Sequence, residues 1–219
     1  MALGHAPFGA WYLGFPALVG FVWLVARVPQ SAAVVWLALF GGAGYFAAIL
    51  NLLVEPFLVD APVYGWMAPF ALVGMAFGWA LFWAVAAAVS FRAKDRALGF
   101  AVALAAVELA RGYVLTGFPC ALIGHIWIET PLAQLAAFVG PSGLTLLTTL
   151  AAALLLRRGT GAVLIAVGWG YGLWALAQPM PADRAATVRL VQPNAAQSMK
   201  WDPDQAQIFM DRLLNLTAE

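Results

Sequence analysis

Long apolar runs separated by short polar connections make up the chain as far as Gln178. Runs of about 20 apolar residues are long enough to cross the hydrocarbon core of a bilayer, which is about 30 Å thick. Because these runs are continuous rather than alternating, they predict helices and not the strands of a barrel. Six transmembrane helices are predicted, over residues 8–26, 31–54, 66–91, 97–115, 131–156 and 161–178.

The pattern changes after Pro179. Residues 187–192 alternate between β-branched and polar side chains and predict a strand. Asp202 as cap, followed by Pro203 in the first helical position, predicts the start of an amphipathic helix. One strand and one helix bury too little surface to be stable alone, so we expect the rest of this domain beyond Glu219 or on another chain.

Composition agrees with a membrane protein. The chain is 64% hydrophobic and 10% charged, with a mean hydropathy of +0.88, which excludes a water-soluble globule. A single cysteine excludes an internal disulfide and a cysteine-based metal cluster. We therefore predict an all-α polytopic helix bundle over residues 1–179, followed by the beginning of an α/β domain over residues 180–219.

Charges in the connections predict the orientation. If the six predicted helices cross the membrane in alternate directions, Glu55, Asp60 and Glu129 lie on one side of it, and the connections on the other side carry basic residues. By the positive-inside rule the basic side is cytoplasmic, which places the tail on the outer face. The first residues would also lie outside, without the features of a signal peptide, so we expect a further helix upstream. The basic residues are Arg27, Arg92, Lys94, Arg96, Arg157 and Arg158.

Glu108 and Arg111 are the ionisable pair inside a predicted helix. Their spacing of three places them on one helix face, near its outer end. Charges in a membrane helix are costly unless they pair or face water, so such residues often serve function. Two interpretations stay open: a purely structural pair, or a part in a lipid-headgroup or substrate site.

Residues 116–130 form a long apolar connection expected in the outer interface, where aromatic residues such as Trp127 favour the headgroup level. The connection also holds Cys120, His125 and Glu129. Spacing within one loop guarantees neither a fixed base nor an oxyanion site, so we do not predict a catalytic triad there.

Gly168, Gly170 and Gly172 resemble a phosphate-binding loop only superficially. No strand precedes them, and they lie inside an apolar run. We interpret the small residues of the apolar runs as sites of close helix packing.

Two blocks of the sequence carry a resemblance. Residues 108–119, Glu-Leu-Ala-Arg-Gly-Tyr-Val-Leu-Thr-Gly-Phe-Pro, resemble the E-x-x-R-G-x-x-x-T-G-F-P-W signature of bacterial apolipoprotein N-acyltransferases. Residues 191–201 resemble the V-Q-x-(N/D)-x-x-Q-x-x-K-W segment that opens the nitrilase-like domain of that family. The match extends in order from the first hairpin, at Ala6, Pro7, Phe8 and Trp11, to Trp201.

The resemblance implies a function and a place in the cell. Members transfer an acyl chain from a phospholipid to the N-terminal diacylglyceryl-cysteine amine of lipoproteins, through a thioester on an αββα nitrilase-like domain. They reside in the bacterial inner membrane, with that domain on the periplasmic face. The resemblance implies no cofactor, metal or nucleic-acid partner. The Glu, Lys and Cys of the family's catalytic triad are expected beyond Glu219.

The resemblance also assigns two substrate-binding residues. Trp201 matches the tryptophan of the K-W block, where an aromatic surface suits contact with lipid or an acyl chain. Arg111 matches the Arg-Gly position, where a guanidinium can bind a lipid phosphate. Cys120 stands where the family has Trp and is not the nucleophile.

Other functions fit the pattern less closely. A non-catalytic scaffold or transport subunit whose tail docks on a partner is the main alternative. A transporter is disfavoured because the sequence has no intramembrane charge cluster and no pair of broken helices. An open reading frame beyond Glu219 that encodes Glu, Lys and Cys in a nitrilase-like domain would decide for the enzyme.

We predict that the 219-residue chain by itself transfers no acyl group, because the residues expected to form the thioester lie outside it. The measurement is the mass of a synthetic diacylated lipopeptide after incubation with the purified chain and phospholipid. A mass increase of one acyl group would contradict the prediction.

Overall fold

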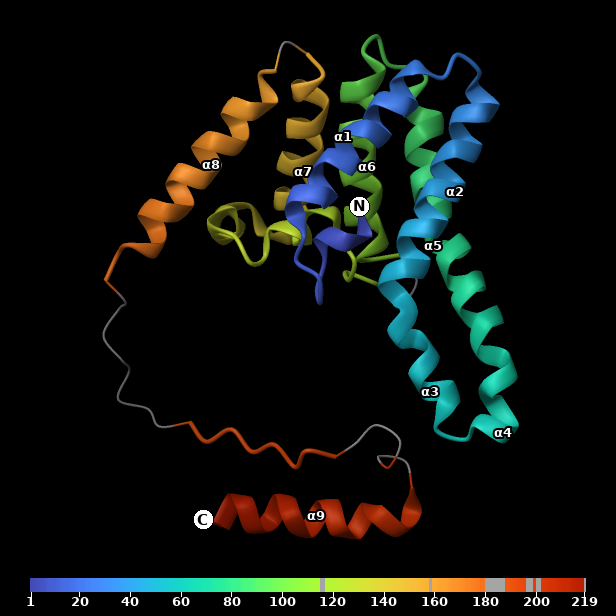
Figure 1. Cartoon of the computed structure of the whole chain (residues 1–219), viewed down its shortest axis with the longest axis vertical. Coiled ribbons are helices and arrows are strands. Elements are labelled where there is room, and N and C mark those ends of the chain that lie inside the picture. The colour runs from blue at the N-terminus through green and yellow to red at the C-terminus, as the bar shows by residue number, and fades with distance from the viewer. Residues whose placement is uncertain (115–116, 158, 180–187, 196–198, 200–201, 219) are drawn as a thin grey trace. The chain divides into compact units, whose positions relative to one another are not determined.

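The computed structural model describes residues 1–114, 117–157, 159–179, 188–195, 199 and 202–218. Within these ranges the regular structure is helical, and no strand occurs (Figure 1). The chain divides into two compact units, which are described separately. The first comprises Met1–Leu50 and Val73–Gln178, and the second comprises Asn51–Leu72 and Pro179–Glu219.

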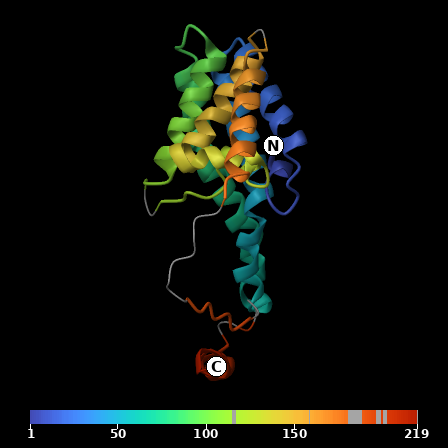
Figure 2. The ribbon, with the colours of Figure 1, turned by 90° about the vertical axis from the view of Figure 1, so that its left-hand side faces the viewer.

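The first unit is a bundle of antiparallel helices (Figures 1 and 2). A helix overlaps each of the six predicted ranges, so the predicted helices are confirmed as helices. α7 packs on α6, and α1 packs on both. The helices are α1 (Trp11–Arg27), α2 (Ser31–Ile49), most of α5 (Ala68–Ser90), α6 (Arg96–Arg111), α7 (Ala136–Leu155) and α8 (Gly161–Leu176), with short 3-10 turns η1 (Ala2–Gly4), η4 (Ile123–Trp127) and η5 (Pro131–Leu135).

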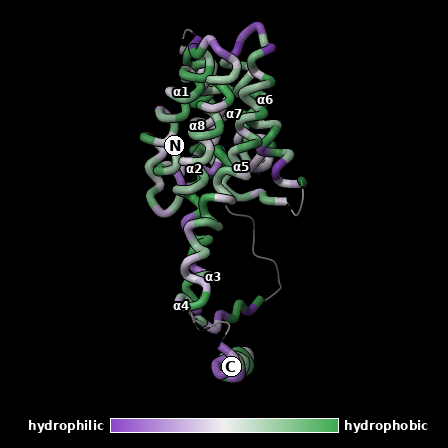
Figure 3. Tube along the Cα trace, turned by 90° about the vertical axis from the view of Figure 1, so that its right-hand side faces the viewer, coloured by the Kyte–Doolittle hydropathy of each residue, from purple (hydrophilic) through white to green (hydrophobic). Residues whose placement is uncertain are grey.

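Among the residues that the structure describes, three helical segments are long and apolar enough to cross a membrane: Ser31–Leu58, Ala61–Ser90 and Pro131–Leu155. Trp11–Arg27 and Gly161–Leu176 are apolar but shorter. The count of six spans therefore stays a prediction. In Figure 3 hydrophobic residues run along the helices of this unit, and hydrophilic residues gather in the connections at one end.

Aromatic side chains form much of the core of this unit. Trp83 of α5 is fully buried, and its ring centroid lies 5.6 Å from that of Phe21 and 5.7 Å from that of Phe46. A second cluster surrounds Trp127, which packs against Trp11 at 5.6 Å. Helices from distant parts of the sequence are thus joined by ring contacts.

Trp127 is buried inside the unit rather than exposed on its surface. Its side chain is 0% exposed, and its indole Nε1 donates to Thr148 Oγ1 of α7 at 2.9 Å. A buried hydroxyl partner satisfies the indole N–H, so the ring can lie in the core. The interfacial depth expected for residues 116–130 stays a prediction.

The range 131–156 is not one continuous helix. It begins as the 3-10 turn η5, and within α7 the backbone leaves helical geometry at Gly140, with φ 65° and ψ −179°. Pro141 follows, and proline cannot donate the hydrogen bond that would continue the turn. A glycine at positive φ followed by proline therefore breaks the helix.

Gly168 and Gly172 of α8 lie at close contacts with η5, which agrees with the interpretation of small residues as packing sites. A Cβ on Gly172 would overlap the backbone carbonyl of Pro131 in η5, whereas a Cβ on Gly170 would meet nothing within 4 Å. Gly172 thus lets the backbone of η5 approach α8.

The second unit contains η2 (Leu50–Val54), α3 (Glu55–Leu58), α4 (Ala61–Tyr64), η3 (Gly65–Met67) and α9 (Pro203–Ala218). The first residue of η2, Leu50, is also the last residue of the Met1–Leu50 segment of the first unit. The predicted helix start is confirmed, since Asp202 Oδ1 accepts the backbone N–H of Asp204 at 3.0 Å.

Residues 188–195 run beside α9. Arg189 Nη1 donates to Thr217 O at 3.2 Å, and Arg212 Nη1 donates to Pro193 O at 2.9 Å. Residues 188–192 of the predicted strand form no strand here, and residue 187 lies outside the described residues. A strand needs a neighbouring strand for its hydrogen bonds, and the described residues contain none. The nitrilase-like strand stays a prediction.

We predict that Gly172→Ala lowers the free energy of unfolding by about 1–3 kcal/mol, because the added methyl group forces η5 away from α8. Gly170→Ala is the matched control on the same helix. It should be neutral or stabilising by up to about 1 kcal/mol, since alanine is the better helix former. Thermal unfolding in detergent measures both variants, and equal melting temperatures would contradict the expectation.

Candidate functional site

The predicted pair Glu108 and Arg111 lies at the end of α6, fully inside the first unit. Their exposed fractions are 1% and 0%. Arg111 Nη2 lies 3.9 Å from Glu108 Oε1, so the two charges attract each other at the limit of ion-pair distance. Because burial of two charges is costly, further hydrogen bonds must stabilise them.

Arg111 obtains those bonds from the connection that follows its own helix. Its Nη1 donates to Phe118 O at 3.0 Å and to Cys120 O at 2.8 Å. Its Nη2 donates to Ala121 O at 3.4 Å. One guanidinium therefore holds three backbone carbonyls of residues 118–121, which fixes the path of the loop.

Aromatic rings enclose the guanidinium. Arg111 Cζ lies 5.1 Å from the ring centroid of Phe46, 5.9 Å from that of Trp79 and 5.5 Å from that of Phe118. Trp79 and Phe118 stack with an interplanar angle of 12°. Cation–π attraction to these rings compensates part of the lost hydration of the charge.

Glu108 fixes the next part of the same connection. Its Oε2 accepts the backbone N–H of Ile123 at 3.0 Å, and its Oε1 accepts the indole N–H of Trp83 at 3.3 Å. The carboxylate thus joins the start of η4 and a tryptophan of α5 to α6.

Tyr45 and His5 complete the network from the other side. The Tyr45 hydroxyl donates to Ala121 O at 3.1 Å. Since a hydroxyl has one proton, the 2.8 Å contact with His5 requires His5 Nε2 to be the donor. In its neutral form His5 then carries the proton on Nε2 and the lone pair on Nδ1. Burial lowers the pKa of His5 to about 4, and the charges of His125 and the N-terminus contribute.

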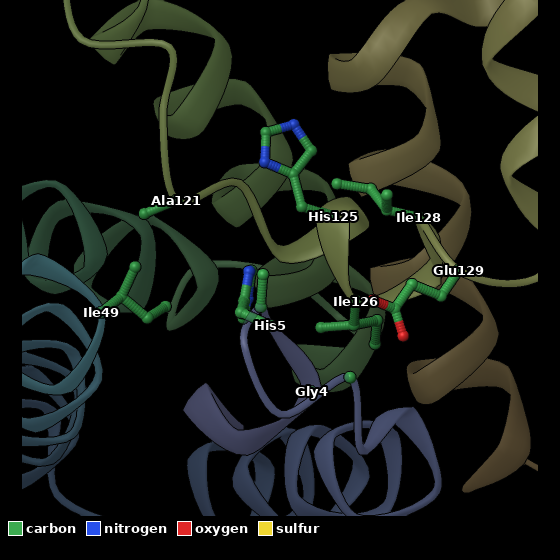
Figure 4. Close-up of a pocket in the computed structure, with 10 residues that line it drawn as sticks. Gly4, His5, Ile49, Ala121, His125, Ile126, Ile128 and Glu129 are labelled. Carbon is green, nitrogen blue, oxygen red and sulfur yellow. The ribbon is translucent and has the colours of Figure 1, made fainter. Parts of the chain in front are cut away.

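Next to this network is a small cleft of about 220 Å³ (Figure 4). Its lining includes Gly4 and His5 from the first turn, with His125, Ile126 and Glu129 from the connection before α7. Burial lowers the pKa of His125, so both imidazoles favour their neutral form. In the described part of the chain, no group of three or more His, Cys, Asp or Glu side chains could hold a metal ion.

A second cleft, of about 420 Å³, lies on the other side of Glu108. Its lining is mostly apolar and includes Tyr113, Pro119, Val139 and Ser142 beside the break in α7. Tyr113 is 80% exposed, so this cleft opens at the surface of the unit.

The structure describes one of the two predicted substrate-binding residues. Arg111 is at the centre of the network, whereas Trp201 lies outside the described residues. Cys120 has an exposed thiol and takes part through its backbone carbonyl. The described hydrogen bonds join the side chain of Cys120 neither to His125 nor to Glu129.

Sequence reasoning missed Tyr45, His5 and Trp83. The sequence offered one signal for His5, which is that the chain has only two histidines. The structure shows that both histidines line the same cleft. Tyr45 is separated from Ala121 by 76 residues, and neither it nor Trp83 stands out among the aromatic residues of apolar runs.

Comparison with known proteins assigns the chain to a family. A family model described as the apolipoprotein N-acyltransferase N-terminal domain matches residues 1–154. The chain belongs to this family. The loop held by Arg111 and Glu108 is thus a feature of an apolipoprotein N-acyltransferase N-terminal domain.

Curated relatives agree over almost the whole chain. A protein of Caulobacter vibrioides named apolipoprotein N-acyltransferase is 40% identical over 99% of this chain. Relatives of the same name from Brucella melitensis and Rhizobium etli are 33% and 35% identical over 99% of this chain. The chain spans 44% of the Caulobacter protein and 46% of each of the other two, so it corresponds to less than half of these apolipoprotein N-acyltransferases.

We predict that the stability of the protein falls as the pH drops from about 6.5 toward 4. With a pKa of about 4, folded His5 binds fewer protons than the unfolded chain, whose histidine titrates near 6.5. The loss is on the order of 3 kcal/mol for a full shift of this size.

Melting temperatures at pH 7 and pH 5, for the wild type and for His5→Gln, measure this effect. Glutamine keeps an N–H donor for Tyr45 but does not titrate, so its melting temperature should fall less. Because His125 is present in both proteins, the difference between their pH dependences reports His5 together with its coupling to His125. Identical pH dependence in the two proteins would contradict the role of His5.

Proposed function

We propose that the protein represented by this chain transfers an acyl chain from a phospholipid to the amine of an N-terminal diacylglyceryl cysteine. The observation that carries this proposal is family membership, shown by a family model over residues 1–154, which include Arg111, and by a relative named apolipoprotein N-acyltransferase that matches 99% of the chain. The phospholipid and the lipoprotein are its substrates, and the bacterial inner membrane is its location.

The chemistry is assigned to a nitrilase-like domain that begins in residues 180–219. A cysteine thiolate attacks the acyl ester, the S–C bond forms, and the lysophospholipid leaves as an alcohol after gaining a proton. The lipoprotein amine then attacks the thioester, so that the amide forms and the thiol is released. The Glu, Lys and Cys for these steps are expected beyond Glu219.

The first unit serves as a platform in this proposal. By the positive-inside rule, the end with the basic connections faces the cytoplasm, and the end with η1, η4 and η5 faces the periplasm. The network of Arg111 and Glu108 fixes the shape of the periplasmic end of this unit. A shaped surface there would orient the lipid substrate for the chemistry.

Arg111 contributes in two ways that the geometry distinguishes. Through its Nη atoms it positions residues 118–121. Its Nε has no acceptor among the described residues but is buried, so a substrate oxygen would reach this N–H only if the surrounding side chains moved. Direct contact of Arg111 with a lipid phosphate and contact of Trp201 with an acyl chain are the substrate-binding roles that we propose.

The test uses the protein from the complete reading frame, purified in detergent, with phospholipid and a synthetic diacylated lipopeptide. We expect the wild type to add one acyl group to the peptide. Arg111→Met should lower the rate at least tenfold, because it leaves Glu108 without its cation and the carbonyls of Phe118 and Cys120 without their side-chain donor, while Ala121 O keeps only Tyr45. Arg111→Lys should fall between, since an ammonium keeps the charge but cannot bridge the same carbonyls.

Arg27→Gln is the matched control, because it removes one positive charge from the last turn of α1. It should retain the wild-type rate. Unchanged transfer by Arg111→Met would disprove the positioning role. A wild-type protein that folds but transfers nothing would disprove the proposed function and favour the scaffold or transport subunit.

A further inference from the structure

A groove of about 570 Å³ lies between α2 and α5 at the basic end of the first unit, opposite the candidate site. Its walls are apolar and include Val35 and Trp36 of α2 with Ala88 of α5. Its rim carries the polar residues Ser31 and Arg92. The groove therefore combines an apolar interior with a polar, positively charged opening.

Arg96 holds the rim in place. Its guanidinium donates to the backbone carbonyl of Val28 and lies 4.4 Å above the ring of Phe91, which lines the groove. The turn between α1 and α2 is thereby tied to the turn between α5 and α6. Because Arg96 is committed to these contacts, it is Arg92 that faces the opening.

Charge at this end is unbalanced. Asp95 is the acidic residue of these turns, and both of its oxygens are occupied: Oδ1 accepts from Leu98 N at 3.0 Å, and Oδ2 pairs with Arg157 at 3.0 Å. Arg92 is exposed and forms no ion pair within the described residues. An anion at the rim would meet a cation that lacks a protein counter-charge.

The first turn of α2 adds a second attraction. Gln30 at the N-cap makes no side-chain capping bond, and the first turn contains no acidic residue. The first N–H groups of the helix thus point toward the rim without a side-chain acceptor at the cap, and the helix dipole makes this position favourable for negative charge. The Ser31 hydroxyl lies at the same position.

Below the rim an aromatic track continues along the lipid-facing surface. Trp36 stacks on Phe40 with 5.8 Å between centroids, and Phe40 meets Phe77 of α5 edge-on at 5.8 Å. Trp36 and Phe40 are 57% and 59% exposed. Exposed rings that extend from a charged rim along a membrane helix suit an acyl chain whose headgroup is held at the rim.

We propose that this groove binds an anionic phospholipid, with its phosphate at Arg92 and the first turn of α2 and one acyl chain along Trp36 and Phe40. Basic pockets between transmembrane helices recognise such headgroups. A zwitterionic lipid would bring its own cation to a rim that is already positive, so the site discriminates by net charge. A free phosphate would gain nothing from the aromatic track.

Native mass spectrometry of the complete protein tests the proposal. The protein is exposed to equal amounts of phosphatidylglycerol and phosphatidylcholine in detergent, and retained lipid is counted. We expect the wild type to retain phosphatidylglycerol preferentially and Arg92→Gln to lose about fivefold of that preference, as expected for one basic residue near a lipid surface. Trp36→Ala should reduce retention of both lipids.

Lys94→Gln is the matched control, since it removes a charge from the same turn but does not line the groove. It should keep the wild-type preference. An equal loss in Lys94→Gln would show a general surface potential and overturn the site, as would unchanged preference in Arg92→Gln. Arg92 is exposed, so both variants should fold, which their melting temperatures verify. The result does not depend on acyl transfer.

Discussion

The architecture of the first unit depends on the burial of one guanidinium. Arg111 is always charged, and a buried charge must regain nearly all the interactions that it loses with water. It does so by binding the carbonyls of Phe118, Cys120 and Ala121 and by lying among aromatic rings. The loop after α6 therefore has one path, and the remaining contacts of that loop follow from it.

Glu108, Tyr45 and His5 extend the same constraint to other elements. Ala121 O accepts from both Arg111 and Tyr45, so one carbonyl joins α6 to α2. Glu108 joins Ile123 and Trp83. In a medium without water such bonds cannot be exchanged for solvent, so a network of this kind specifies one arrangement.

The two ends of the unit use charge in different ways. At the end with the loop, the charges are buried and satisfied by backbone groups, which gives a fixed surface. At the basic end, Asp95 neutralises part of the charge, Arg96 ties two turns together, and Arg92 lies at an open groove. Buried charges thus fix the surface at the end with the loop, whereas the basic end leaves the cation of Arg92 exposed beside a groove.

Sequence alone determined the features that depend on local pattern. Apolar runs of sufficient length predicted the helices, the i, i+3 spacing placed Glu108 and Arg111 on one face, and Asp202 with Pro203 marked the start of α9. The motif around Arg111 indicated the family, which the comparisons confirmed. Each of these features is carried by residues close together in the chain.

Tertiary structure decided what requires distant residues to meet. Trp127 can be buried because Thr148, from another segment, provides a buried acceptor for its indole N–H. The partners of Arg111 are backbone carbonyls, which every residue possesses and which no sequence pattern marks. Tyr45 and His5 joined the site only because α2 and the first turn pack beside the loop. Chain-local spacing fixes which face a side chain occupies, whereas its partners depend on how the helices pack.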